Sequence, residues 1–368
     1  MKLRIISVLM LIFLSAALLH ARQKDEVRFA YDVGFEMKFD NREFYRSSFS
    51  KSMTIFGARL TPSVGLKIGD EHRVMAGIDV MKDFGSQTKE IIKEATIYYQ
   101  LNKQLNDTGL ELYAGIFPRQ ATEGSYSEAF FSDSLKFYDN NLEGLLLKFR
   151  RPEAYFELGC DWMGQYGDAT RERFMIFSSG EGKVAPVLTF GYSGYMYHFA
   201  GSRQVKGVVD NILVNPYARL DLGDRMGLQK FSIRLGWLQA LQNDRRNVGR
   251  YVYPGGGEFD LEIMKWNICV RNSLFCGTDM MPYYNRPDAG GVKYGNSLYF
   301  GDPFYRVHDG EDGGIGTYDR LDVFWTPRLG EYLKIKVGAR FHFNDSSYSG
   351  CQQVVALEFD LNRIVKRK

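Results

Sequence analysis

The chain has 368 residues and a formal net charge of +3, and 45% of its residues are hydrophobic and 15% aromatic. This length fits two ordinary domains or one large barrel, and the near balance of charge gives no reason to expect nucleic acid as a partner. Aromatic residues favour strands and glycine marks turns and bends, so 38 Gly with only 10 Pro favours a β-rich fold.

The first 21 residues have the pattern of a secretory signal peptide. Lys2 and Arg4 precede a short apolar run from 5 to 19, and Ala21 offers a small residue at a cleavage point. A membrane anchor is the alternative, but this run is shorter than the roughly 20 residues that a spanning helix needs. We predict a signal peptide at 1–21 and one domain at 22–368.

Beyond the signal, polar and apolar residues alternate with a period of two, which is the pattern of a strand with one apolar face. Apolar residues at 27, 29, 31, 33, 35, 37 and 39 show it first. The segments with this pattern are 27–39, 53–68, 73–84, 90–101, 110–117, 142–150, 154–162, 171–177, 185–199, 208–222, 228–238, 258–264, 268–276, 317–325, 332–343 and 351–361. Between 258 and 276 we place a break near 265–267, because an unbroken strand would put a very long loop on the side of the short turns.

The strand at 332–343 shows what the alternation implies. Its apolar residues occupy every second position, and Lys334, Lys336 and Arg340 occupy positions between them. The strand is about twice the usual 5 or 6 residues of a globular strand, and about right for a tilted strand that crosses a bilayer. We therefore expect its apolar face to contact lipid and its polar face to line a lumen.

Loop lengths support a barrel. The connections at 69–72, 151–153, 223–227 and 327–331 are short, whereas those at 40–52, 118–141, 242–256 and 277–316 are long. The two groups fall on opposite ends, as periplasmic turns and extracellular loops do. We predict an all-β fold, a closed antiparallel transmembrane β-barrel of about 16 strands (14 to 18), with a soluble sandwich as the alternative.

Several segments resemble known proteins: LYAGIFPR at 112–119, the pair Asp161-Trp162, RERF at 171–174 and VVDN at 208–211. With these, the whole mature chain resembles bacterial outer-membrane porin-like barrels, in particular uncharacterised barrels of the Bacteroides group. The resemblance implies a barrel in the bacterial outer membrane and carries over no functional residues. The chain departs from such barrels by ending in a basic tail, with Arg363 and 366–368, rather than at an aromatic residue of the last strand.

If the apolar faces look outward, charged residues of both signs line the lumen, where they could filter polar solutes. The pore-lining candidates are Glu157, Asp161, Arg173, Arg234, Arg320, Asp322, Lys334, Lys336, Arg340 and Glu358. Alternatively, these charges only pair across strands and keep the interior wet. The loop at 118–141 could fold inward beside Glu157, Asp161 and Arg173 to form a constriction.

An enzyme is the rival interpretation. The processed chain would keep His72, His198, His308 and His342, and it has neither a GxSxG nor an HExxH motif. His198 and Asp210 flank one loop and could approach each other, so a His-carboxylate site is possible.

We expect no metal and no cofactor. The acidic segment DGEDGG at 309–314 lacks the spacing of an EF-hand loop. The four cysteines have no metal-ligand spacing, and a disulfide between Cys269 and Cys276 is improbable because they would point to opposite faces of one strand.

The predicted function is therefore that of an outer-membrane porin-like channel, not an enzyme, allowing passive diffusion of small hydrophilic solutes. The alternatives are a loop-occluded barrel that acts as a surface binding or assembly protein, and a barrel hydrolase. The expected partners are outer-membrane lipid, small polar solutes and, as a possibility, two further copies in a homotrimer.

Overall fold

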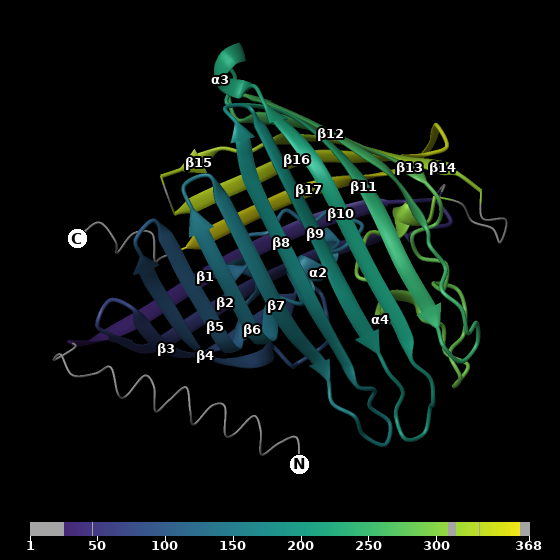
Figure 1. Ribbon diagram of the computed structural model, residues 1–368, viewed down its shortest axis with the longest axis horizontal. Helices are drawn as coiled ribbons and strands as arrows, with labels where there is room; N and C mark the ends of the chain where they lie inside the picture. Colours follow the sequence, from purple (N-terminus) through teal and green to yellow (C-terminus); the bar gives the residue numbers. More distant parts are fainter. Residues whose placement is uncertain (1–25, 46, 308–313, 331, 361–368) are drawn as a thin grey trace.

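The computed structural model describes residues 26–45, 47–307, 314–330 and 332–360. They form one antiparallel sheet of 17 strands, which closes on itself because β1 pairs with β17 (Figure 1). One of these strands, β15, covers only Arg328–Leu329 beside β16. Sixteen long strands therefore form the wall of a closed barrel, as predicted.

Each long strand pairs with the next one along the chain, and β14 pairs with β16 past the short β15. The long strands are β1 Val27–Glu43, β2 Met53–Ile68, β3 His72–Asp83, β4 Ile92–Leu105, β5 Thr108–Pro118, β6 Asn141–Arg151, β7 Ala154–Gly164, β8 Arg173–Ala185, β9 Leu188–Phe199, β10 Val209–Asp221, β11 Lys230–Asp244, β12 Gly255–Lys265, β13 Ile268–Gly277, β14 Gly316–Trp325, β16 Leu333–Asn344 and β17 Ser347–Asp360.

The helical segments in the described residues are short: η1 Arg119–Ala121, α2 Asp133–Tyr138, α3 Gly223–Met226, α4 Gly295–Leu298 and η2 Pro303–Arg306. None of them has the length and apolarity needed to cross a bilayer. Except for α3, which lies in a turn, they belong to two long connections, 119–140 and 278–315.

The two ends of the barrel differ in the length of their connections, as the sequence predicts. At the turn end, most connections have only a few residues, and at the loop end lie the long ones (Figure 1). Trp266 and Asn267 form a two-residue hairpin turn in which both φ angles are positive, 53° and 64°, which confirms the break predicted there. One connection departs from the rule, because β16 and β17 are joined at the loop end by two residues, Asp345 and Ser346.

Several predicted strand boundaries differ from the structure, and the largest difference is at the end of β8. The alternation suggested that a strand ends at 177, but β8 continues to Ala185. The residues from Ser178 to Lys183 are small or polar, so they show no apolar period although they pair with β9 in register. Backbone pairing with β9 extends the strand, and the pattern of side chains does not reveal this pairing.

Burial is inverted relative to a soluble protein. Ile97 on the outer surface is 61% exposed, whereas Glu157 and Arg340 inside the barrel are 0% and 3% exposed. Apolar side chains that face outward around a closed barrel are stable only in contact with lipid. This arrangement excludes the soluble sandwich.

Candidate functional site

The ten candidate pore-lining residues lie on the inner face of the barrel wall, but the structure brings only some of them together. Asp322 accepts hydrogen bonds from Arg320 at 3.0 Å and from Arg340 at 2.8 Å. Arg234 pairs instead with Asp260 at 3.2 Å, and Lys334 with Glu358 at 2.8 Å. Most of these charges are neutralised by neighbours, and a functional role for any one of them stays a prediction.

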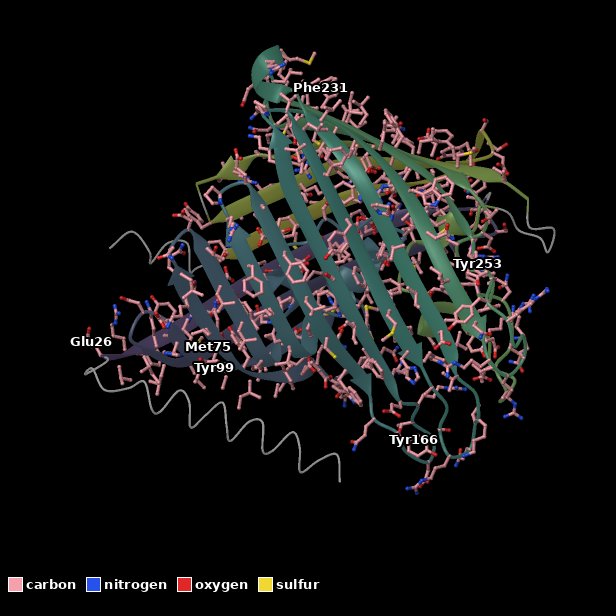
Figure 2. The ribbon with its side chains drawn as sticks, in the orientation of Figure 1. Glu26, Met75, Tyr99, Tyr166, Phe231 and Tyr253 are labelled. Atoms are coloured by element: carbon pink, nitrogen blue, oxygen red, sulfur yellow. The ribbon has the colours of Figure 1, made fainter. Side chains whose placement is uncertain are left out.

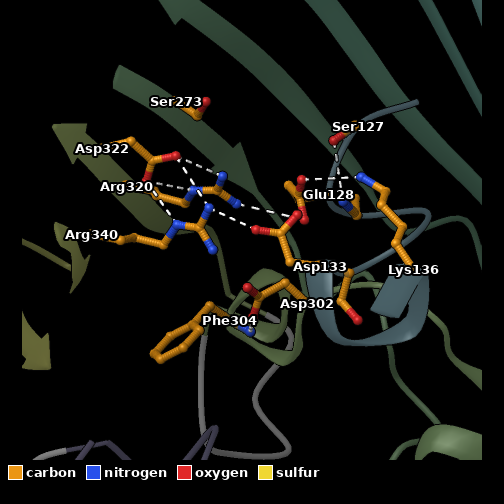
Figure 3. Close-up of polar contacts among 12 residues, drawn as sticks. Ser127, Glu128, Asp133, Lys136, Ser273, Asp302, Phe304, Arg320, Asp322 and Arg340 are labelled. Atoms are coloured by element: carbon orange, nitrogen blue, oxygen red, sulfur yellow. Dashed lines mark hydrogen bonds and ion pairs between the residues drawn. The ribbon is translucent and has the colours of Figure 1, made fainter. Parts of the chain in front are cut away.

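Two connections enter the barrel from the loop end, and together we call residues 119–140 and 278–307 the plug. The first contacts the wall through charged groups: Asp133 pairs with Arg340 at 2.7 Å, and Glu128 with Arg320 at 3.6 Å (Figure 3). Glu157 accepts hydrogen bonds from the backbone N–H groups of Glu123 and Gly124. The predicted folding-in of 118–141 is thus observed.

The remaining candidates near this segment also bind local groups. Asp161 pairs with Arg119 of the plug at 3.4 Å. Arg173 donates to the backbone carbonyl of Met163, and Lys336 places its Nζ 4.2 Å from the centre of the Phe324 ring.

The second plug segment is rich in aromatic residues and packs against the inner face of β9, β10 and β11. Tyr197 donates to the carbonyl of Ser297 at 3.1 Å, and Asn211 donates to that of Leu298 at 3.0 Å. Around them lies a buried cluster rich in aromatic residues, to which both plug segments and the wall contribute. Much of the barrel interior is therefore filled.

His342, the most buried histidine among the described residues, belongs to this packing. Its Nδ1 lies 2.8 Å from the Tyr318 hydroxyl and its Nε2 3.0 Å from Oε1 of Gln352, while its ring stacks on Phe304. Both ring nitrogens are already paired, so His342 has no nitrogen left for a reacting group. His308 lies outside the described residues, as does most of the acidic segment 309–314.

The outer surface carries a different arrangement at the loop end. One side chain from each of five neighbouring strands lies in a single cross-strand row, which we call the outward row: Trp162, Phe174, His198, Asp210 and Asn243. The rings of Trp162 and Phe174 stack with centroids 5.3 Å apart, and those of Phe174 and His198 with centroids 4.9 Å apart. His198 thus lies between an aromatic surface and a carboxylate.

Asp210 is held firmly in this row. Arg245 donates from Nε and Nη2 to the two carboxylate oxygens at 2.7 and 2.8 Å, and the Tyr251 hydroxyl donates at 3.2 Å. This hydrogen bonding raises the pKa of Arg245, and the negative charge of Asp210 raises the pKa of Tyr251. The carboxylate of Asp210 is therefore held in a fixed position in the strand next to His198.

Basic residues surround the outward row. The loops 200–208 and 245–254 carry five exposed basic side chains, which we call the basic rim: Arg203, Lys206, Arg245, Arg246 and Arg250. The two loops contact each other, because Arg246 donates to the carbonyl of Lys206 at 3.2 Å. The aromatic Tyr253 lies at the same end of the barrel, opposite the end of Phe231 (Figure 2). This rim suits an anionic group at the membrane surface.

Immediately below the outward row, towards the turn end, the next row is apolar. Two positions along the same strands, the outward residues in register are Cys160, Ile176, Met196, Ile212 and Leu241. Ile176 is 39% and Met196 37% exposed on a surface that faces lipid. A polar row thus borders a surface that acyl chains can contact.

The outward row contains no hydroxyl or thiol side chain. The serine nearest to His198 along the chain, Ser202, is buried, and its Oγ accepts a hydrogen bond from the N–H of Val205 at 3.0 Å. His72 lies in β3 at the turn end, with its Nδ1 2.7 Å from the Tyr99 hydroxyl. The four cysteines are free, and the described residues hold no group of three or more His, Cys, Asp or Glu arranged for a metal.

Residues 21–243, more than half of the chain, match the model of the family described as Lipid A 3'-O-deacylase-type. The chain belongs to this family. The stretch matched by the deacylase-type model extends almost to the end of β11 and contains the whole outward row. None of the curated proteins compared with this deacylase-type chain is significantly similar to it in sequence.

Solved structures resemble its fold. A loop L8 deletion form of OmpT, an outer membrane protein of Vibrio cholerae, matches with 11% identity and a TM-score of 0.52 over 92% of this chain and 100% of that one. Outer-membrane expressed OmpT of the same species gives 10% identity and a TM-score of 0.49 over 92% and 98%. A mutant of the Rh. blastica porin gives 10% and 0.44 over 90% and 100%. The first likeness supports the fold alone, an outer-membrane barrel, and confirms the predicted location in the bacterial outer membrane.

The prediction of a passive porin without enzymatic activity is wrong. The family to which the chain belongs is named for removal of an acyl group from lipid A, which is the work of a hydrolase. Alternating strands predict a barrel whatever the barrel does, so the pattern could not separate a channel from an enzyme. The resemblance to outer-membrane barrels holds, but the porin-like part of it does not.

Sequence reasoning found part of the outward row and missed the rest. His198 and Asp210 were paired because they flank one loop, and the structure places them opposite each other in register. Arg245 and Tyr251 come from the next loop, and nothing in their spacing shows that they contact Asp210. The available signal was two outward polar residues, Asp210 and Asn243, where strand residues facing lipid are usually apolar.

Proposed function

We propose that this protein is an outer-membrane acyl hydrolase that cleaves an ester-linked acyl chain from lipid A or a similar glycolipid at the outward row. The observation that carries the proposal is that His198 and Asp210, whose carboxylate is held by Arg245 and Tyr251, lie opposite each other in register on the outer surface. The family match supports the choice of reaction. The loop end is the extracellular end of such barrels, so the row lies beside the outer leaflet.

The surroundings of the row fit a lipid that stays in its membrane. An acyl chain can lie along the apolar row that includes Ile176, Met196 and Ile212, because these side chains already face lipid. An anionic headgroup then meets the basic rim, where arginine and lysine bind phosphate or carboxylate oxygens. The ester between headgroup and chain lies at the level of His198.

The chemistry follows from the two central side chains. The neutral imidazole of His198 takes a proton from a water molecule as the water oxygen attacks the ester carbonyl carbon. The imidazolium then returns this proton to the alkoxide oxygen as the carbon–oxygen ester bond breaks. The products are a free fatty acid and a glycolipid hydroxyl.

Asp210 acts on the imidazole and not on the substrate. Its negative charge stabilises the imidazolium, and Arg245 and Tyr251 keep the carboxylate in place. Water serves as the nucleophile because the row offers no hydroxyl side chain.

The test uses the full-length protein refolded in vesicles that contain lipid A, with released fatty acid measured by mass spectrometry. We expect His198→Ala to lower the rate of release by about 100-fold or more, as loss of a general base does. Asp210→Asn should lower it less, because the imidazole remains. His72→Ala is the matched control, since His72 lies at the opposite end of the barrel, and should leave the rate unchanged.

Folding of each variant is checked by the shift of its gel mobility on heating. Absence of fatty acid release by the folded wild-type protein would refute the hydrolase. Equal release by wild type and His198→Ala would refute the assigned site.

A further inference from the structure

A cavity of about 430 Å³ lies inside the barrel, away from the outward row. Its walls come from β1, β16 and β17, where the barrel closes, and from the first plug segment, including helix α2. Charged residues of both signs and several aromatic residues line it. A cavity of this volume is large enough for a small molecule, and its many charged groups favour a charged one.

Two lysines of the cavity lining start from one level of the barrel wall. Lys38 of β1 and Lys336 of β16 are both in register with Ala356 of β17, which stands between them. Their backbones are thus two strand spacings apart, about 10 Å. Because Ala356 is small, the space between the two lysines is left open.

Neither lysine has a carboxylate within ion-pair distance among the described residues. Lys38 donates to the backbone carbonyl of Asp133 at 3.2 Å, and Lys336 lies over the Phe324 ring. The charge of Asp133, which pairs with Arg340, also acts on both lysines, so their ammonium groups are partly neutralised. A further anionic group in the space beside Ala356 would lie between the two lysine side chains.

Two carboxylates lie at the next level towards the turn end. Glu36 of β1 is in register with Glu358 of β17, two residues from Lys38 and therefore about 6.6 Å along the strand. Glu358 is neutralised by Lys334 at 2.8 Å. Glu36 has no ion pair in the part of the chain that the structure describes, although it lines the cavity.

We propose that this cavity binds a small zwitterion, such as a short ω-amino acid. Its anionic group lies between Lys38 and Lys336, and its ammonium group lies at Glu36. A chain of a few methylene groups spans the distance between the two levels and packs against the aromatic lining, which includes Phe131 and Phe137. The site is independent of the outward row.

Calorimetric titration of the refolded full-length protein in detergent tests this with three probes. 4-Aminobutanoate carries both charges, whereas butanoate and butylamine carry one each. We expect the dissociation constant of 4-aminobutanoate to be at least tenfold lower than that of either single-charge probe. Equal affinity for the three probes, or no binding of any, would overturn the proposal.

Substitutions show which residues bind each end of the zwitterion. In the double variant Lys38→Gln and Lys336→Gln, 4-aminobutanoate should bind no more tightly than butylamine. In Glu36→Gln, it should bind no more tightly than butanoate. Ala356→Leu keeps every charge but fills the space, and should abolish binding. Lys103→Gln is the control, because Lys103 pairs with Glu71 away from the cavity. Unchanged binding in the double lysine variant, with a heat-modifiable barrel, would contradict the assignment.

Discussion

Asp210 faces outward and yet is only 9% exposed, because a loop covers it. Its carboxylate accepts three hydrogen bonds from Arg245 and Tyr251, which fix its position in the strand next to His198. A charged side chain on the lipid side of a barrel is costly unless it is paired. The covering loop therefore supplies both the shield and the partners that this position requires.

The hydroxyl of Tyr251 gives a prediction for a single residue. Tyr251→Phe removes one hydrogen bond to Asp210 and should lower the rate of acyl release by about 2- to 10-fold, with little change in KM. Tyr253→Phe is the matched control, because its ring lies beside Tyr251 with centroids 6.4 Å apart. Steady-state kinetics on lipid A vesicles measures both. Equal effects of the two substitutions would show that the contact with Asp210 does not matter.

Among the structural elements, helix α2 of the plug is bound to the barrel wall by charged side chains. Burial by itself would raise the pKa of Asp133, but Arg340, Lys38 and other cations outweigh it and hold this pKa well below its usual value. A carboxylate whose pKa is lowered in the folded state stabilises that state above its unfolded pKa. The stabilisation is lost as the pH falls through the lower, folded pKa.

Asp133→Asn should therefore loosen the plug at pH 7, and the difference from wild type should shrink as the pH falls below about 4. Hydrogen exchange of peptides covering 119–140, corrected for the intrinsic effect of pH, measures this. Lys103→Gln again serves as a control without contact to the plug. A difference that stays constant from pH 7 to the acid range would contradict the role of this carboxylate.

The plug also shows where sequence reasoning stops. Polar lumen residues at 157, 161 and 173 indicated that the long loop 118–141 could fold inward, but not that it does. The segment 278–307 gave no comparable signal, because its aromatic residues follow neither a helical nor a strand period. The wall residues that bind this segment, such as Tyr197 and Asn211, are also far away in the chain.

For the whole molecule, inversion of burial is the property that places it in a membrane. Strand alternation was enough to predict the barrel, its count of long strands and the sorting of its loops, since each follows from local pattern and chain order. The function could not be predicted in this way. It depends on a few outward polar residues at one end of the barrel, which depart from the alternating pattern.

An arginine substituted on the outer face of the barrel tests whether that face contacts lipid. Leu145 is 54% exposed in the middle of β6, and Leu145→Arg should lower the free energy of unfolding by about 2–4 kcal/mol in lipid vesicles. Leu105→Arg, at the turn end of β4, should cost about 0–1 kcal/mol. Urea titration in vesicles provides the comparison. Similar costs at the two positions would argue against a lipid-facing band.

The contacts of the plug also fix an order of assembly. Glu128 and Asp133 come from the first half of the chain, but their partners Arg320 and Arg340 lie in β14 and β16 near its end. Contacts between such distant segments form late, because a long loop must close first. These two ion pairs can therefore form only after β14 and β16 are in place, so they mark a late stage of folding.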